Sequence, residues 1–301
     1  MGRRVFCDRR RKGATIPVDI SVLGPARVYG SHGRVAMPQQ RIRAVLTSLA
    51  AQPRQAVSAD EIAVDVWGSR TPLGAVTTVR SYIARLRRVL APHLDGVPVR
   101  DVVVTSDRGY VLQVEDHQLD WCRFVTDVDK GTTLLGTGEP RSAAVVLHRA
   151  LGEWRGAPFI DIANSPRGAG LAAWLQELRL TALQVEGEGL LQGEDYARHI
   201  PRLAALVVEY PLQERLWEQL VLTLTKCGRR AEALVTFGQA RDALRVGLNV
   251  EPGSRLTAAY NAARDEGGAS DPNTSWDRRG TGADRRRDTR RHTSAGPATP
   301  T

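Results

Sequence analysis

The stretch TTVRSYIARLRRVL, residues Thr77 to Leu90, predicts a helix with two opposed faces, and the later stretch VVVTSDRGYVL, Val102 to Leu112, predicts a short hairpin. At about 100° per residue, one side of this helix is apolar. The opposite side carries short polar residues and arginines. We expect one face to pack on a core and the other to meet solvent or a ligand. The apolar side is formed by Val76, Val79, Ile83, Leu86 and Leu90.

The polar face of this helix suits the major groove of B-DNA, which admits an α-helix. Arginine can grip a guanine edge with two hydrogen bonds, and serine or threonine can contact several bases. An isolated arginine-rich helix is more often an ordinary solvated surface, so the neighbouring elements must decide. We expect base contacts from Thr77, Thr78, Ser81 and Arg85, base or backbone contacts from Arg88, phosphate contacts from Arg80 and Arg87, and a minor-groove contact from Arg108 at the hairpin tip.

The elements before this helix predict a winged helix. Short strands are expected at 20–23, 27–29 and 35–37, between Gly-rich and Pro-rich turns, and a helix at 39–51. Ser58-Ala-Asp-Glu61 is a capping-box signature, which predicts the start of a second helix that ends at Gly68. The resulting order is strands, three helices and a hairpin, and the hairpin is then the wing.

From Leu119 to about Ala263 the apolar spacing is helical throughout. Gly193 and Gly228 lie 35 residues apart and each separates two helices, close to the roughly 34-residue period of tetratricopeptide helix pairs. Stacked pairs of this kind usually bind partners. The predicted fold class is mixed: an N-terminal α+β winged helix and an all-α, tetratricopeptide-like repeat domain. Helices are expected at 121–135, 141–153, 170–191, 196–209, 213–227, 230–244 and 253–264.

Length and charge set the outer bounds of the function. The 301 residues suffice for two domains, and no run approaches a membrane span or a secretory signal, so we expect a cytoplasmic protein without a membrane partner. The net charge is +9, and the excess lies in residues 1–18, 19–115 and 267–301, whereas 116–266 is slightly acidic. This distribution favours a phosphate-binding N-terminal domain. Residues 1–18 and 267–301 lack apolar periodicity and are expected to be a disordered basic arm and tail.

The sequence offers no convincing catalytic, metal or cofactor site. Gly131–Gly136 has the spacing of a phosphate loop, but Thr137 and Gly138 replace the lysine and hydroxyl residue that such a loop needs. Gly168–Ala173 fits a helix entrance better than a dinucleotide loop, because Asn164-Ser-Pro166 precedes it. We therefore expect neither an enzyme nor a bound cofactor or metal. Cys7, Cys122 and Cys227 are expected reduced, the last two buried, and Trp154, Trp174 and Trp217 are expected in the core.

In this order, the motifs resemble one family closely: the Streptomyces antibiotic regulatory proteins, transcriptional activators that join an OmpR-type winged helix to a bacterial transcriptional activation domain. The resemblance covers about Asp19 to Asp265. In the first domain it rests on Ile20–Pro25, Gln40–Leu46, Val66–Gly68, Ser81–Arg87 and Arg108–Leu112. In the second it rests on Trp154–Gly156, Glu177–Leu180, Tyr210–Trp217, Gly228–Leu234 and Gly247–Gly253.

The resemblance implies an activator of a secondary-metabolite gene cluster that binds double-stranded DNA at direct repeats near the promoter −35 element. It further implies two protomers bound head to tail and contacts with RNA polymerase and its sigma factor. The expected domains are the winged helix at 19–115 and the activation domain at 116–266. Two alternatives remain: a repressor with the same DNA-binding face, and a helical-repeat adaptor whose winged helix binds protein.

Overall fold

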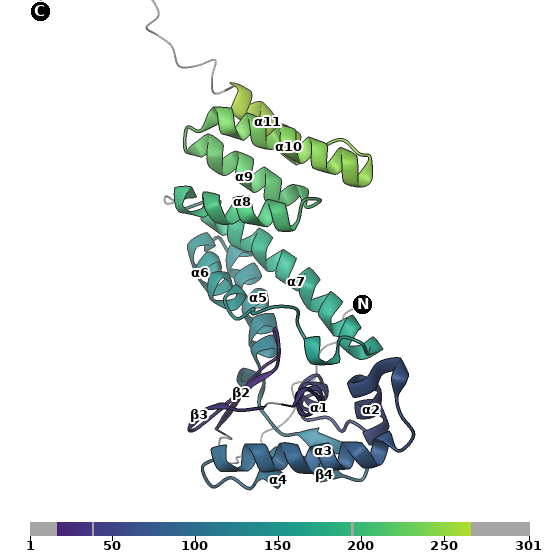
Figure 1. Cartoon of the computed structure of the whole chain (residues 1–301). Helices are drawn as coiled ribbons and strands as arrows, with labels where there is room; N and C mark the ends of the chain where they lie inside the picture. Colours follow the sequence, from purple (N-terminus) through teal and green to yellow (C-terminus); the bar gives the residue numbers. More distant parts are fainter. Residues whose placement is uncertain (1–16, 38, 194–195, 266–301) are drawn as a thin grey trace, which may run out of the picture.

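The computed structural model describes residues 17–37, 39–193 and 196–265. Figure 1 shows these residues as a winged helix with a stack of helices above it. The predicted basic arm and basic tail lie outside the described residues, except that Pro17 and Val18 are described.

The N-terminal unit begins with a three-stranded antiparallel sheet in the order β1-β2-β3, in which Ile20 pairs with Val28 and Val28 with Val35. These alternate residues are all buried, so one face of the sheet joins the core. The strands match those expected from the turn residues, with ends shifted by up to two residues. They are β1 (Val18–Ser21), β2 (Arg27–Gly30) and β3 (Gly33–Val35).

Three helices follow, and the third is the helix that the sequence singled out. α3 (Ala75–Leu90) packs on α1 (Gln40–Ala50) and α2 (Ala59–Trp67). Its predicted apolar side is buried, except that Val76 is half-buried and Ala75 is buried in its stead. At the start of α2, the Ser58 hydroxyl accepts a hydrogen bond from Glu61 N at 3.2 Å, and the Glu61 carboxylate accepts one from Ser58 N at 2.8 Å. The predicted capping box is confirmed.

The predicted hairpin is also confirmed and forms the wing. β4 (Val103–Ser106) and β5 (Gly109–Leu112) pair antiparallel, and Asp107 and Arg108 form the two-residue turn between them. A four-residue helix, α4 (Val99–Val102), precedes β4 and was not expected from the sequence. The wing joins the rest of the unit where Tyr110 and Val57 exchange two backbone hydrogen bonds of 2.9 Å.

The C-terminal unit consists of helices that pack against their neighbours along the chain (Figure 1), which confirms the predicted fold class. Each of the seven predicted helices is present, with shifts of a few residues at the ends. None of the helices in the described part of the chain is both long and apolar enough to cross a membrane. The helices are α5 (Asp120–Gly136), α6 (Pro140–Leu151), α7 (Pro166–Leu191), α8 (Ile200–Glu209), α9 (Glu214–Lys226), α10 (Arg230–Leu248) and α11 (Ser254–Asp265).

The longest helix, α7, begins with a side-chain cap and later contains two glycines. The Ser165 hydroxyl accepts from Gly168 N at 3.0 Å, so the glycine pattern at 168 is a helix entrance, as expected. The helix continues through Gly187 and Gly189. A Cβ atom at Gly187 would lie 2.2 Å from the Gln219 side chain of α9, and one at Gly189 would lie 2.5 Å from the Pro140 carbonyl of α6. These glycines let neighbouring helices approach α7 closely.

Two expectations about burial are wrong. Trp174 is 45% exposed, and its ring meets the Trp121 ring in a T-shaped arrangement with a centroid distance of 6.4 Å. It lies on the outer side of α7, where helical context alone does not distinguish a packed tryptophan from a surface one. Cys227 is half-buried, because it follows the last residue of α9. Cys122 is buried as expected, and burial raises the pKa of its thiol to about 12.

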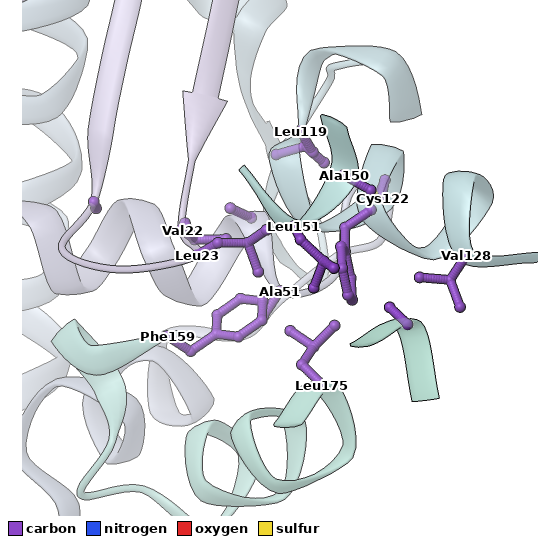
Figure 2. Packing of buried hydrophobic residues seen from close by; sticks show 14 of the residues in the cluster. Val22, Leu23, Ala51, Leu119, Cys122, Val128, Ala150, Leu151, Phe159 and Leu175 are labelled. Carbon is purple, nitrogen blue, oxygen red and sulfur yellow. The ribbon is translucent and has the colours of Figure 1, made fainter. Parts of the chain in front are cut away.

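The two units share one hydrophobic core. Val22 and Leu23, which follow β1, belong to the same buried cluster as Phe159 and as Leu175 of α7, and Figure 2 shows these side chains where the units meet. All four are fully buried. The winged helix and the helical unit are therefore packed on each other rather than joined by an exposed linker.

Candidate nucleic-acid interface

The predicted polar face of α3 is open to solvent. Thr77, Arg80, Ser81, Arg85 and Arg88 are exposed. The helix starts after Gly74, whose φ of 78° lies in the left-handed region, and its sixteen residues include no acidic side chain. This side of α3 can therefore approach a polyanion without repulsion from its own carboxylates.

The hydroxyl groups of this face are oriented by their own helix. The Thr78 hydroxyl donates to the Gly74 carbonyl at 3.3 Å, and the Ser81 hydroxyl donates to the Thr77 carbonyl at 3.5 Å. Thr78 is half-buried, so it is less accessible than the other predicted contacts. With its hydrogen donated to the backbone, each hydroxyl oxygen still has lone pairs with which to accept a bond from a base.

Arg85 lies beside the start of α1. Its Nη1 donates to the Gln39 side-chain oxygen at 3.4 Å, a long and exposed hydrogen bond. Gln39 immediately precedes α1. The structure thus adds Gln39 to the predicted interface, as a polar group that touches the proposed base-reading arginine. A contact over 46 residues of chain leaves no signal in local sequence patterns.

Arg87 has different surroundings from the other arginines of α3. Its Nε donates to the Val103 carbonyl at 2.9 Å, and its Nη2 donates to the Thr105 hydroxyl at 2.7 Å. Burial of the guanidinium lowers its pKa from the ordinary value. Arg87 therefore ties α3 to strand β4 of the wing, and its expected contact with phosphate stays a prediction.

Arg108 is exposed in the turn at the wing tip. The neighbouring Gly109 has a φ of +141°, and a Cβ atom there would lie 2.1 Å from the Val57 carbonyl. Only glycine allows the wing to approach Val57, two residues before α2, this closely. The wing tip is thus held on one flank of the polar face of α3, and Arg108 extends from it.

A stacked group on the other flank was not expected as a site. The Arg41 guanidinium lies over the Trp67 ring, 5.0 Å from its centroid, and the Trp67 and Tyr82 rings are 6.1 Å apart. Arg41 is exposed in the first turn of α1. These residues occur in the family motifs quoted above, but a motif does not reveal that three separate helices bring them together.

Taken together, the face presents basic and hydroxyl groups in the order Arg41 and Gln39, then α3, then the wing. Such a surface can bind a phosphate backbone and donate hydrogen bonds to base edges. The structure places seven of the eight predicted residues on or beside the open face and turns the guanidinium of the eighth, Arg87, to the wing.

The two units correspond to two families of known domains. Residues 36–112 match the family described as "Transcriptional regulatory protein, C terminal", and residues 119–264 match "Bacterial transcriptional activator domain". The strands β1 to β3 lie outside both matches.

Similar proteins match over most of this chain. Transcriptional regulator RedD from Streptomyces coelicolor is 34% identical, over 79% of this chain and 68% of RedD. Regulatory protein DnrI from Streptomyces peucetius is 31% identical, over 81% of this chain and 91% of DnrI. A solved structure of Mycobacterium tuberculosis EmbR, in complex with a low affinity phosphopeptide, has a TM-score of 0.75 and 27% identity, and covers 83% of this chain and 66% of the EmbR chain.

Proposed function

Because this chain belongs to the Streptomyces antibiotic regulatory proteins, a family of transcriptional activators, we propose that it binds DNA sequence-specifically through the exposed face of α3. The target is the promoter region of a secondary-metabolite gene cluster, and binding switches that cluster on. The protein acts in the cytoplasm, on the nucleoid.

One observation carries this proposal: α3 buries one side in the winged-helix core and presents on the other side only small, hydroxyl and arginine side chains, without a carboxylate. An α-helix placed in the major groove reads base edges with such groups. In this arrangement Arg85, Ser81, Thr77 and Thr78 meet bases, and Arg88 meets a base or the backbone.

The arginines on either side of the polar face of α3 position the protein on the duplex and do not read its sequence. Arg80 and the stacked Arg41 meet phosphates beside the groove, and Arg108 enters the neighbouring minor groove from the wing tip. Arg87 keeps its bonds to β4 and reaches phosphate only with the remaining guanidinium nitrogen. Phosphate contacts fix the register of a protein on the duplex but carry no base information.

Activation is the role of the helical domain. Its stacked helices form a surface of the kind that binds other proteins, here RNA polymerase and its sigma factor. Two protomers bind direct repeats near the −35 element head to tail, because a head-to-tail interface pairs with repeats of the same orientation.

The test uses the full chain and a randomised duplex library. The chain should enrich one motif twice in the same orientation, and its affinity for the enriched duplex should fall linearly with the logarithm of salt concentration through counterion release. An inverted repeat would show that the head-to-tail arrangement is wrong. No enrichment and no salt dependence would contradict DNA reading altogether and leave the adaptor. A reporter behind the enriched site then gives the sign: increased expression for an activator, decreased expression for a repressor.

A further inference from the structure

The two units are joined first at the end of strand β1. The buried Asp120 carboxylate at the start of α5 accepts from Val22 N at 2.7 Å and from Leu23 N at 2.9 Å. Arg155 contacts the same carboxylate at 3.4 Å and donates to the Pro25 carbonyl at 2.9 Å. Phe159, with a φ of 53°, donates its backbone N–H to Val22 O at 2.8 Å. A left-handed backbone conformation is unfavourable for a bulky residue such as phenylalanine. The packing of Phe159 and its hydrogen bond to Val22 therefore hold the backbone in this conformation.

A second junction connects the start of α7 with α1 and α2. The Arg167 guanidinium forms an ion pair with the Asp65 carboxylate of α2 and donates to the Ser48 hydroxyl of α1 at 2.9 Å. Ser48 in turn donates to Asp65 at 2.6 Å. The Asp65 side chain is 3% exposed, so this is a buried charge whose cation comes from the other unit.

The second junction lies directly before the DNA-reading helix. Asp65 is in the last turn of α2, and a Cβ atom at Gly68 would lie 2.8 Å from the Asn164 carbonyl. Gly68 begins the single turn of 3-10 helix, Gly68–Arg70, that leads through Thr71 to Gly74 and α3. Residues 164–167 of the helical unit thus contact the last turn of α2 through the Arg167 side chain and the start of the following turn through the Asn164 backbone.

The chemistry of the Asp65–Arg167 ion pair favours a role in orienting the two units rather than in stabilising the fold. A buried ion pair contributes little net stability, because desolvation offsets the attraction. The second amino nitrogen of Arg167, Nη1, is buried without a hydrogen-bond partner in the described structure, which weakens any stabilising effect further. What the pair does supply is a directional contact between two rigid elements.

We propose that Asp65 and Arg167 are positioning residues for DNA recognition, through which the helical domain braces the turn before α3 and so sets how α3 enters the major groove. This inference rests on the proposed DNA-reading role of α3. The helical domain then contributes to sequence recognition, although none of its residues is placed against a base.

The test compares Arg167→Ala with Arg202→Ala in the full chain. Arg202 of α8 is a matched control, because it pairs at 2.7 Å with Glu186, whose side chain is also 3% exposed, and its partners Glu186 and His148 both belong to the helical domain. The unchanged chain and both variants are titrated with the duplex that the unchanged chain enriches and with a scrambled duplex, well below all three melting temperatures. Amide hydrogen exchange of residues 68–74 is measured without DNA.

Both variants should melt at a lower temperature. Only Arg167→Ala should lose about tenfold in affinity for the enriched duplex, the size of one weakened base contact, with a smaller loss on scrambled DNA and faster exchange at 68–74. The decisive quantity is the affinity ratio, the affinity for the enriched duplex divided by that for the scrambled duplex. Equal affinity ratios in the two variants would overturn the positioning role. If Arg167→Ala does not fold, Arg167→Lys carries the test: it keeps the charge beside Asp65 but lacks the planar fork, and full retention of the affinity ratio would overturn the inference. If the unchanged chain enriches no duplex, the proposed function itself is wrong and this inference with it.

Discussion

The arginines of α3 and the arginines of the junction between the units have the same side chain but opposite surroundings. Arg80, Arg85 and Arg88 are exposed. Arg155 and Arg167 have side chains only 21% and 19% exposed, and each faces a carboxylate that is almost fully buried. An arginine that keeps its donors in solvent can give them to a ligand, whereas one that has given them to a buried carboxylate holds two elements together. Arg87 resembles the second group because it holds α3 to β4, although its acceptors are a carbonyl and a hydroxyl rather than a carboxylate.

If the buried carboxylates hold the two units together, the largest loss of stability should follow the replacement of Asp120. Asp120→Ala leaves the N–H groups of Val22 and Leu23 without their acceptor at the junction, and each such buried group costs about 1–3 kcal/mol. We expect a loss of roughly 3 kcal/mol or more in the free energy of unfolding, measured by denaturant titration.

Asp127→Ala is the control for Asp120→Ala. Asp127 also lies on α5 and pairs with an arginine, but Arg149 is 69% exposed and the pair does not join the two units. This change should cost about 1 kcal/mol or less. Similar losses in the two variants would contradict the view that the junction holds the units together.

A smaller effect is expected from Arg87→Ala. The change removes the hydrogen bonds to Val103 and Thr105, so it should lower the free energy of unfolding by roughly 1–2 kcal/mol. Arg80→Ala, an exposed change on the same helix, should stay within about 0.5 kcal/mol. Both are measured by denaturant unfolding without DNA. If Arg87→Ala proves as mild as Arg80→Ala, the wing is not held by this arginine.

The smallest effect is expected at the wing tip. Arg108→Ala should leave the melting temperature unchanged, since Arg108 is exposed and makes no hydrogen bond within the described structure. It should weaken binding to enriched and scrambled duplexes by similar factors, roughly threefold to tenfold, as expected for a contact that carries little sequence information. Fluorescence titration of both duplexes measures this. A loss confined to the enriched duplex would make Arg108 a base-reading residue.

The sequence predicts features whose cause is local. The apolar side of α3, the capping box at Ser58 and Glu61, and the hairpin with its turn at Asp107 and Arg108 follow from spacing and residue type within one segment. The two domains and the function were then predicted from the order of these motifs, which resembles that of one family.

The sequence does not predict contacts between distant segments. Asp120 meets Val22 across 98 residues, and Arg167 meets Asp65 across 102. Helical periodicity placed Arg87 on a flank of α3, but it says nothing of β4, whose Val103 carbonyl and Thr105 hydroxyl accept hydrogen bonds from Arg87 on that flank. Trp174 shows the converse, since its helix is packed while nearly half of the Trp174 surface is exposed to solvent. In both cases the partner, or its absence, is set by the tertiary arrangement.

Arg85→Ala, compared with the unchanged chain on the enriched and the scrambled duplex at one salt concentration, tests the central claim most directly. Arg85 is exposed and makes only a long hydrogen bond to Gln39. The change should therefore alter the free energy of unfolding by no more than about 0.5 kcal/mol. It should cost roughly 1–3 kcal/mol of binding free energy on the enriched duplex, with relaxed preference at one base pair and little loss on scrambled DNA. Equal losses on both duplexes would contradict base reading by α3 and leave Arg85 as a backbone contact.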